Sequence, residues 1–464
     1  MRRKSVVKFP LTWYNNGELL LPVGANSEVV MKKKSVKILL AALLSCLMAM
    51  ALCACSLFSW GYKADSNYPF DIAKESGFTG TEAEWASEQK SPSTLYRRLY
   101  EEAVADGYTG SYFEFRTALN LSAMDATPYV QRAMLSVVSI VCTFGVGSEG
   151  AAGSGVIINL NKTTGDAYIL TNYHVVYSKT GRVKISNDIH VYLYGYENAT
   201  SVMSAQYVGG VMEQDIAVLK ITNSALLRES AALAATVADS AGVMAGQPVY
   251  AIGNAMNDDI AVNAGVVSME TEYIYMEALN GSGYMNLACI RFDGTVNHGN
   301  SGGGLFNAMG ELVGIVNGRD ERDGVTGFNY AIPTKIALSI AENIMDNGGA
   351  RVADFGLDLT FGDTKAVYDE TPGVVHYLEK IVVEHRSGAA ASAGVRPGDT
   401  LISAAIVRGG VEQKTVQFLR YPDFLGFTFT VRMGDSVKFT VSRDGAAVEL
   451  IYSFTQSGEF ESFA

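Results

Sequence analysis

Positive charge is scarce in this sequence. Its 464 residues include 36 Lys and Arg against 48 Asp and Glu, which gives a net charge of -12 at pH 7. A surface that binds nucleic acid needs clustered Lys and Arg, and so does tight electrostatic binding to anionic lipid. The composition therefore argues against both kinds of partner.

Cysteine is also scarce, and it is unevenly placed. Cys46, Cys53 and Cys55 lie in one apolar segment near the start, and only Cys142 and Cys289 lie further along the chain. Both of these stand inside apolar, strand-like runs, SIVCTF and NLACIRF, so we expect buried free thiols rather than a disulfide. No zinc-type spacing and no HExxH motif occurs, so we expect no metal site and no cofactor.

Long stretches with helical periodicity are few after about residue 130. Short β-branched runs separated by Gly and Asn dominate there, which is the pattern of antiparallel strands. The length indicates about three folded units and some shorter segments. The sequence therefore predicts a mainly β protein.

Residues 31–55 have the plan of a secretory signal: a basic start, an apolar run and small residues at the end. The last four, Leu52 to Cys55, resemble a bacterial lipobox, although Cys53 stands where Ala or Ser is usual. We predict lipidation at Cys55, with an uncleaved membrane anchor as the alternative. In both cases the body would lie outside the cytoplasm, anchored to the membrane at the cell envelope. A signal normally begins a chain, so we expect Met31 to be the true start and residues 1–30 to be a mis-called upstream segment.

Residues 56–125 contain a short repeat. Phe70–Trp85 and Tyr100–Phe115 share a helical turn, a Gly-aromatic-Thr-Gly sequence, and a Glu followed by an aromatic residue. These features are typical of a helix, a turn and a second capped helix. We predict a helical repeat region, either a surface-binding module or a spacer that holds the body away from the membrane.

Three side chains in the body suggest a catalytic triad. Ser301 lies in the glycine-rich GNSGGG, where backbone N–H groups, those of Gly299 and Ser301, can converge on an oxyanion. His174 lies in LTNYHVV after a strand-like run, and Asp215 precedes the strand-like IAVLKI, where a half-buried acid can orient an imidazole. The order His, Asp, Ser is that of chymotrypsin. Ser301 would be the nucleophile, His174 the general base and acid, and Asp215 the orienting group.

These motifs occur together with GSGVII, YAIGN, GVVS, ELVGIV and GFNYAIP, in the order found in the HtrA/DegP family of trypsin-fold proteases, which residues 135–345 resemble. The resemblance implies a double antiparallel β-barrel over residues 126–347 and serine endopeptidase activity. It further implies unfolded or exposed polypeptide substrates, a role in envelope protein quality control, and a homotrimer. Gly304 and His298 stand where the family usually has Pro. These departures leave open a non-catalytic peptide-binding or chaperone protein with a relic triad.

Substrate binding can be predicted only coarsely. Thr295, six residues before Ser301, corresponds to the floor of the primary pocket in trypsin-like folds, and its lack of charge favours a small or medium aliphatic side chain. Asn300 is neutral and cannot form the ion pair that activates trypsin-like zymogens, so we expect activation by loop ordering or by a ligand. The edge that pairs with the substrate backbone is expected at Val316, Asn317 and Gly318.

The last part of the chain resembles a PDZ domain of the HtrA kind, over residues 351–458. The resemblance is carried by FGLDL, SGAAASAGVRPGDTLISA and MGDSVKFTVSRDG. In such domains a peptide adds a strand to a sheet edge, and backbone amides bind its C-terminal carboxylate. The carboxylate loop is expected at Phe355, Gly356 and Leu357; alternatively, these residues only begin the first strand.

Overall fold

The structure is a computed structural model. It describes residues 18–22, 28–32, 100–101, 103–105, 126–147, 150–196, 201–238, 240–319, 327–369, 374–413 and 415–463. The chain divides into two units, Met1–Trp85 and Ala86–Ala464. In the first unit, strands β1 (Glu18–Pro22) and β2 (Glu28–Lys32) pair as an antiparallel hairpin. Most of the predicted leader and repeats lies outside the described residues. Within the repeats, residues 100–101 and 103–105 are helical.

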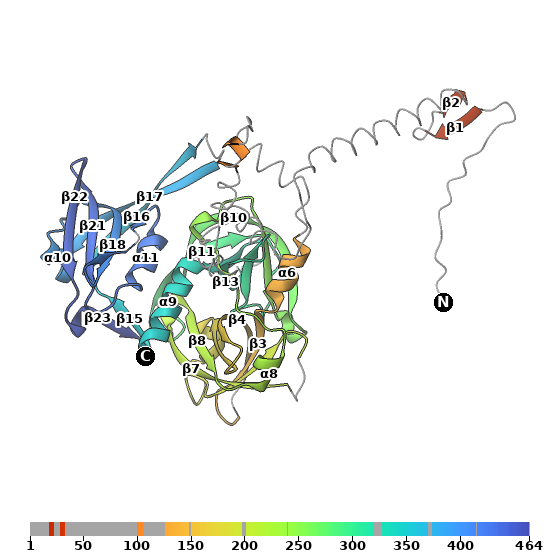
Figure 1. Cartoon of the computed structure of the whole chain (residues 1–464), viewed down its shortest axis with the longest axis horizontal. Coiled ribbons are helices and arrows are strands. Elements are labelled where there is room, and N and C mark those ends of the chain that lie inside the picture. The colour runs from red at the N-terminus through yellow and green to blue at the C-terminus, as the bar shows by residue number, and fades with distance from the viewer. Residues whose placement is uncertain are drawn as a thin grey trace. The chain divides into compact units, whose positions relative to one another are not determined.

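Six antiparallel strands of the second unit close into a first barrel, in the order β3-β4-β5-β8-β7-β6 (Figure 1). Alternate residues of each strand face inward, because successive side chains of a strand point to opposite faces. The interior is filled by fully buried apolar side chains such as Ile140, Ile157, Ile169 and Leu219. The strands are β3 (Val137–Thr143), β4 (Ala151–Asn161), β5 (Asp166–Thr171), β6 (Asp188–Leu193), β7 (Met203–Val211) and β8 (Ile216–Ile221).

A second closed barrel follows, in the order β10-β11-β14-β13-β12-β9. Phe292, Leu305 and Val316 are among its buried residues. The strands are β9 (Pro248–Gly253), β10 (Ala261–Glu277), β11 (Tyr284–Phe292), β12 (Gly304–Asn307), β13 (Leu312–Arg319) and β14 (Asn329–Pro333). The predicted mainly β fold with a double antiparallel barrel is confirmed.

Short helices connect the strands, and one longer helix ends the barrel region. The helices are α6 (Thr127–Met134), α7 (Tyr173–Val176), α8 (Ala225–Glu229) and α9 (Thr334–Asn347), with 3-10 turns at Met212–Gln214, Ser240–Gly242 and Ala255–Asn257. Helix α9 buries Ile336, Ile340 and Ile344, which recur every four residues and therefore share one face. This face contacts strands of both barrels. Helix α9 thus lies against the seam between them.

A third β-structure follows α9. Its sheet has the order β16-β17-β18-β21-β22, with β19 and β20 beside β18, while β15 and β23 form a separate pair. The ring of Phe355 lies in its core, within 5.0–6.4 Å of four other Phe rings. The strands are β15 (Ala350–Ala353), β16 (Leu357–Asp369), β17 (Val374–Arg386), β18 (Thr400–Arg408), β19 (Val411–Glu412), β20 (Val416–Gln417), β21 (Ser436–Arg443), β22 (Ala446–Ser453) and β23 (Phe460–Phe463). The helices are α10 (Gly388–Ala393) and α11 (Tyr421–Thr428), with a 3-10 turn at Ser457–Glu459.

The two cysteines of the barrels are free and fully buried, as the sequence predicted. Burial raises the pKa of the Cys142 thiol to about 12. It also raises the pKa of Cys289 well above its ordinary value. Both thiols are therefore inert packing groups at neutral pH, because the reactive form of cysteine is the thiolate.

Candidate active site

His174 lies on the short helix α7, which follows strand β5. Tyr173, Val175 and Val176 of the same helix are buried and fix it against the first barrel. The side chain of His174 is 34% exposed, so its ring reaches the surface of the barrel. Three apolar neighbours thus hold one polar ring at a defined place.

Asp215 lies between the 3-10 turn Met212–Gln214 and strand β8, with a left-handed φ of 49°. Its carboxylate is almost fully buried, at 1% exposure. Asp215 Oδ2 lies 2.6 Å from His174 Nδ1, and Asp215 Oδ1 accepts the backbone N–H of His174 at 2.8 Å. The two bonds fix both the position and the orientation of the imidazole, as a catalytic base requires.

The pKa of His174 follows from this geometry. Desolvation by the surrounding protein would lower it, but the charge of Asp215 and the hydrogen bond to its carboxylate outweigh that effect. The pKa is therefore raised above its ordinary value. Such a balance is typical of an imidazole that must accept a proton during a reaction.

Ser301 stands in a tight turn at the start of β12. Gly299 and Gly302 have φ of 95° and 84°. A Cβ at Gly302 would lie 2.1 Å from the carbonyl oxygen of Ser154. Ser154 holds the turn from β4, since its N–H donates to Ser301 O at 2.8 Å and its hydroxyl donates to Gly299 O at 2.7 Å. The glycines are required here because the turn packs directly on another backbone.

The backbone N–H groups of Gly299 and Ser301 are available to a ligand. In the part of the chain that the structure describes, neither N–H donates to a protein acceptor. The N–H of the intervening Asn300 is already bonded to Asn297 O at 3.1 Å. The two unpaired donors are thus the N–H groups on either side of Asn300, one of them that of Ser301 itself, and they are the pair predicted to form an oxyanion hole.

Asn317 joins the parts of the site. Its side-chain amide donates to Asp215 Oδ2 at 2.6 Å, and its carbonyl oxygen accepts the hydroxyl of Ser301 at 3.0 Å. Asp215 comes from the first barrel, whereas Ser301 and Asn317 come from the second. One residue therefore contacts two members of the proposed triad. The sequence indicated Asn317 only as part of the substrate edge, and no local pattern revealed the role of its side chain.

The other predicted substrate residues differ in accessibility. Thr295 is exposed, and Gly318 has no atom within 4 Å of the position its Cβ would take. Val316 is fully buried, its carbonyl accepts from Gly302 N, and its N–H donates to Gly303 O, both at 2.8 Å. The backbone of Val316 is thus already paired with the nucleophile turn.

Two departures from the family pattern lie near Ser301. His298 is exposed, and its carbonyl oxygen accepts the N–H of Met256 at 2.7 Å. Gly304 is buried, and a Cβ there would lie 2.2 Å from the ring of Phe306. The Phe306 ring thus fills the space that a larger residue at Gly304 would need, and the turn stays packed.

The loop predicted to bind a peptide carboxylate is built around Phe355, which is buried in the aromatic core. Gly356 has a φ of 65°, its N–H donates to Asp354 Oδ1 at 2.8 Å, and its carbonyl accepts Ser387 N at 2.7 Å. Leu357 begins β16, which is the edge strand of the sheet. The loop therefore opens onto a sheet edge.

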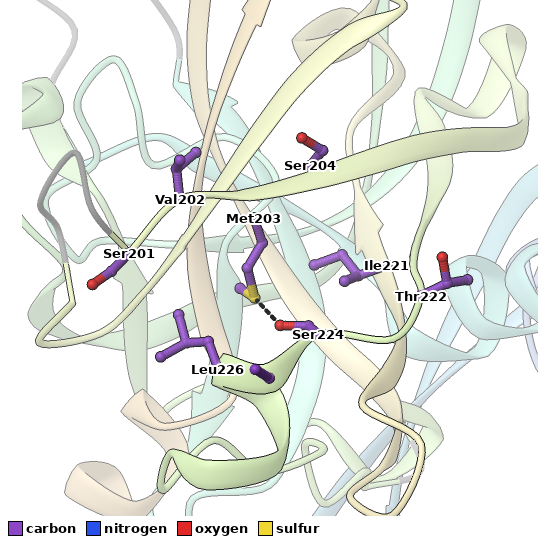
Figure 2. A pocket seen from close by; sticks show the side chains of 9 residues that line it. Ser201, Val202, Met203, Ser204, Ile221, Thr222, Ser224 and Leu226 are labelled. Atoms are coloured by element: carbon purple, nitrogen blue, oxygen red, sulfur yellow. Dashed lines mark hydrogen bonds between the residues drawn. The ribbon is translucent and has the colours of Figure 1, made fainter.

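A pocket of about 420 Å³ lies elsewhere, on the first barrel (Figure 2). It is formed by the start of β7, the end of β8 and helix α8, and Met203 Sδ accepts the hydroxyl of Ser224 at 3.2 Å inside it. No triad residue lines it. Among the described residues, no three His, Cys, Asp or Glu side chains form a group that fits a metal ion.

The predicted lipidation site, Cys55, lies outside the described residues. Within the described ranges, no helix is both long and apolar enough to span a bilayer.

The fold and the site define a class of protein. Residues 153–315, which include all three proposed triad residues, match the sequence model of a protein family described as a trypsin-like peptidase domain. With the double barrel and the His174–Asp215 pair, the chain is a trypsin-like serine peptidase.

Known proteins narrow this class to a family. The serine protease Do-like HtrA of Lactococcus lactis subsp. lactis (strain IL1403) is 30% identical over 311 residues, which are 63% of this chain and 68% of that protein. The periplasmic serine endoprotease DegP of Escherichia coli (strain K12) is 28% identical over 349 residues, 72% of this chain and 65% of that protein. A solved structure of the HtrA-type protease AlgW with tripeptide covers 71% of this chain and 97% of that chain, at 28% identity and a TM-score of 0.46. The chain belongs to the HtrA family of serine endoproteases.

Proposed function

We propose that this serine endopeptidase cleaves unfolded or exposed polypeptides through an acyl-enzyme at Ser301, with His174 as base and acid and Asp215 as the orienting group. The observation that carries the assignment is the double contact of Asn317, whose side chain bonds Asp215 while its carbonyl bonds the hydroxyl of Ser301. Side chains from both barrels thus meet at one place.

The proposed chemistry gives each of these groups a role. His174 Nε2 takes the proton of Ser301 Oγ while that oxygen attacks the peptide carbonyl carbon. The negative charge that develops on the carbonyl oxygen is stabilised by the N–H groups of Gly299 and Ser301. The imidazolium, held by Asp215, then protonates the leaving amine. Water repeats the sequence on the ester and releases the new C-terminus, without a cofactor.

The substrate is expected to lie along the edge of β13. The carbonyl of Asn317 and the uncrowded side-chain position of Gly318 support an extended chain bound here as an added strand. Thr295 has no charge, which favours an aliphatic side chain before the cleaved bond. Because the backbone of Val316 is already paired with the turn around Ser301, it would contribute less to substrate binding than the backbones of Asn317 and Gly318.

We further propose that residues 351–458 form a PDZ domain that binds C-terminal peptides at Phe355–Leu357, next to the open edge of β16. Residues 126–347 would be the protease domain, and 56–125 a helical spacer. The DegP relative is named a periplasmic endoprotease, which supports a place outside the cytoplasm. Envelope quality control and a homotrimer rest on the resemblance to the HtrA/DegP family alone. Attachment to the membrane would come from a lipid on Cys55.

The experiment that tests the activity compares wild type with Ser301→Ala on unfolded casein. We expect cleavage by the wild type and none above background by the variant. Labelling with a fluorophosphonate probe separates this function from a relic triad, since only an activated serine reacts. A wild type that neither cleaves casein nor labels at Ser301 would support the non-catalytic peptide-binding alternative.

A further inference from the structure

Aromatic side chains join the barrels to the C-terminal sheet. At this junction the hydroxyl of Tyr273 on β10 donates to Glu379 on β17, at 2.5 Å. Glu379 is buried and also accepts the N–H of Tyr421 on α11, at 2.8 Å. The ring of Phe361 stacks on Tyr421 at 4.1 Å and lies 5.1 Å from Tyr273. The junction is thus a closed aromatic contact around one carboxylate.

The β10–β11 hairpin carries aromatic residues away from this junction. Tyr275 follows Tyr273 by two residues and therefore lies on the same face of the strand. Its ring stacks on that of Tyr284 at 4.7 Å, with 11° between the planes. Tyr275 and Tyr284 are nevertheless 71% and 67% exposed. This stacked pair continues the junction outward without a cover of its own among the described residues.

The β16–β17 hairpin, which contributes Glu379 to the junction, also carries aromatic residues away from it. It extends beyond the rest of its sheet (Figure 1). Tyr368 pairs with Val375, and Ala366 pairs with Tyr377, so these four side chains share one face with Glu379. Tyr368 and Tyr377 are 63% and 51% exposed. The opposite face of the hairpin carries charged residues, among them Asp363, Lys365 and Lys380.

An amphipathic hairpin with its apolar face exposed is costly for a monomer, because such patches favour association. Tyrosine is the side chain that interfaces prefer, since its ring supplies contact area and its hydroxyl stays hydrated. Both exposed stripes begin at the Tyr273–Glu379 contact and extend away from it. Both stripes are therefore continuous with the aromatic contact that joins the barrels to the C-terminal sheet.

We propose that Tyr275, Tyr284, Tyr368, Val375 and Tyr377, here called the tyrosine surface, bind an unfolded polypeptide segment rich in apolar and aromatic side chains. This segment would be a remote part of the substrate, and the proposal rests on the proposed function in that respect. None of the five residues belongs to the proposed triad, and Tyr368 and Val375 pair near the end of the β16–β17 hairpin opposite Leu357. Binding there keeps a long substrate at the enzyme and raises the effective concentration of its cleavable bonds.

The tyrosine surface predicts a difference between long and short substrates. Only a long chain can occupy the surface and the active site together. Loss of the surface should therefore raise the KM for casein and leave kcat/KM for a short peptide unchanged. Because each tyrosine would make its own aromatic contact with the bound segment, removal of two tyrosines should raise the KM roughly tenfold.

The experiment uses the full chain and two double variants, Tyr368→Ser with Tyr377→Ser, and Tyr275→Ser with Tyr284→Ser. The matched control is Tyr194→Ser with Tyr196→Ser, two exposed tyrosines of the first barrel. Kinetics are measured with unfolded casein and with a short chromogenic peptide. Binding of fluorescent casein is measured in the Ser301→Ala background, where no cleavage interferes.

We expect both double variants to bind casein about tenfold more weakly, with the control unchanged. Casein binding within twofold of wild type in both double variants overturns the proposal. An equal loss of short-peptide cleavage also overturns the proposal, because it places the effect on the catalytic machinery. A change of oligomeric state in sedimentation overturns it as well, because it assigns the surface to a second copy of the chain. Failure of the proposed function is distinct, because it removes cleavage by the wild type and leaves casein binding by Ser301→Ala measurable.

Discussion

The hydroxyl of Ser301 donates to the carbonyl oxygen of Asn317, 3.0 Å away. The hydroxyl proton therefore points to a backbone acceptor in this state, while His174 is held ready by Asp215. A substrate strand that pairs with β13 would bring its own N–H groups to this edge and compete for the same carbonyl. Loss of that bond frees the hydroxyl to turn toward the imidazole. We therefore expect substrate binding to activate Ser301, the proposed nucleophile, through this one carbonyl group.

The rate should follow the titration of His174. The imidazole is a base only when neutral, and Asp215 raises its pKa above the ordinary 6.5 despite the opposing effect of burial. We expect kcat/KM for a short peptide to fall as the pH decreases, with a midpoint above pH 6.5. In Asp215→Asn the amide no longer stabilises the imidazolium, so the midpoint should move down and the rate at neutral pH should fall by about 10⁴. A pH–rate profile of both proteins checks this, and an unchanged midpoint in the variant would contradict the role of Asp215.

The same shift predicts how stability depends on pH. Because the folded state raises the pKa of His174, the folded state binds this proton more tightly than the unfolded chain does. Its contribution to stability is present below the unfolded pKa and is lost as the pH rises through the folded pKa. The difference in Tm between wild type and His174→Ala should therefore be larger at about pH 5 than at about pH 8. A pH-independent difference would show that the loss is one of packing alone.

Asn317→Ala should reduce the rate more than the binding of substrate. The variant removes a donor at 2.6 Å from the buried carboxylate of Asp215 but keeps the backbone carbonyl that contacts Ser301. A hydrogen bond to a charged group contributes about 1.5–3 kcal/mol, so we expect kcat to fall roughly tenfold to a hundredfold with little change in KM. The midpoint of the fall in rate at acid pH should move to a higher pH in this variant, since the Asp215 carboxylate with fewer hydrogen-bond donors stabilises the imidazolium of His174 more strongly. Asn159→Ala, at an exposed position of the first barrel, is the control. An equal loss in both variants would point to general destabilisation.

Gly302→Ala should destabilise the protein as well as inactivate it. The backbone has a φ of 84° there, and the new Cβ would lie 2.1 Å from the carbonyl oxygen of Ser154. The strained backbone alone costs about 1–3 kcal/mol, and the contact forces β4 and the nucleophile turn apart. Gly318→Ala is the matched control, since its Cβ meets no atom within 4 Å. Thermal unfolding should show a lower Tm for Gly302→Ala only, and equal Tm values would contradict the packing described for the turn.

Much of the fold and the site was predictable because it is local in sequence. The glycine turn around Ser301, the apolar neighbours of His174 and the strand after Asp215 each indicated their own geometry, and the order of motifs indicated two barrels. The side-chain bond of Asn317 to Asp215 was not predictable, because 102 residues separate them and only barrel closure brings them together. The pairing of Val316 with the nucleophile turn has the same origin. The tyrosine surface depends on which residues of β16 and β17 pair with each other. The alternation of residue types along a strand does not reveal this register when both strands are 13 residues long.

Asn343 is a second link between the barrels and the C-terminal sheet, beside the Tyr273–Glu379 contact. It is fully buried on α9, its Nδ2 donates to the carbonyls of Arg351 and Phe429, and its Oδ1 accepts Arg351 N, all at 2.7 Å. Asn343→Ala leaves these backbone groups buried without partners, so we expect a loss of about 2–4 kcal/mol in the free energy of unfolding. Ser339→Ala, which loses only a hydroxyl bonded within α9, is the control and should cost less than about 1 kcal/mol. Urea unfolding followed by far-UV circular dichroism measures both. Because these bonds join the barrel region to the C-terminal sheet, the Asn343 variant should also unfold in two steps where the wild type shows a single transition. One cooperative transition at the wild-type midpoint would mean that α9 is held to the sheet by its other contacts, and that Asn343 is not the link between the two.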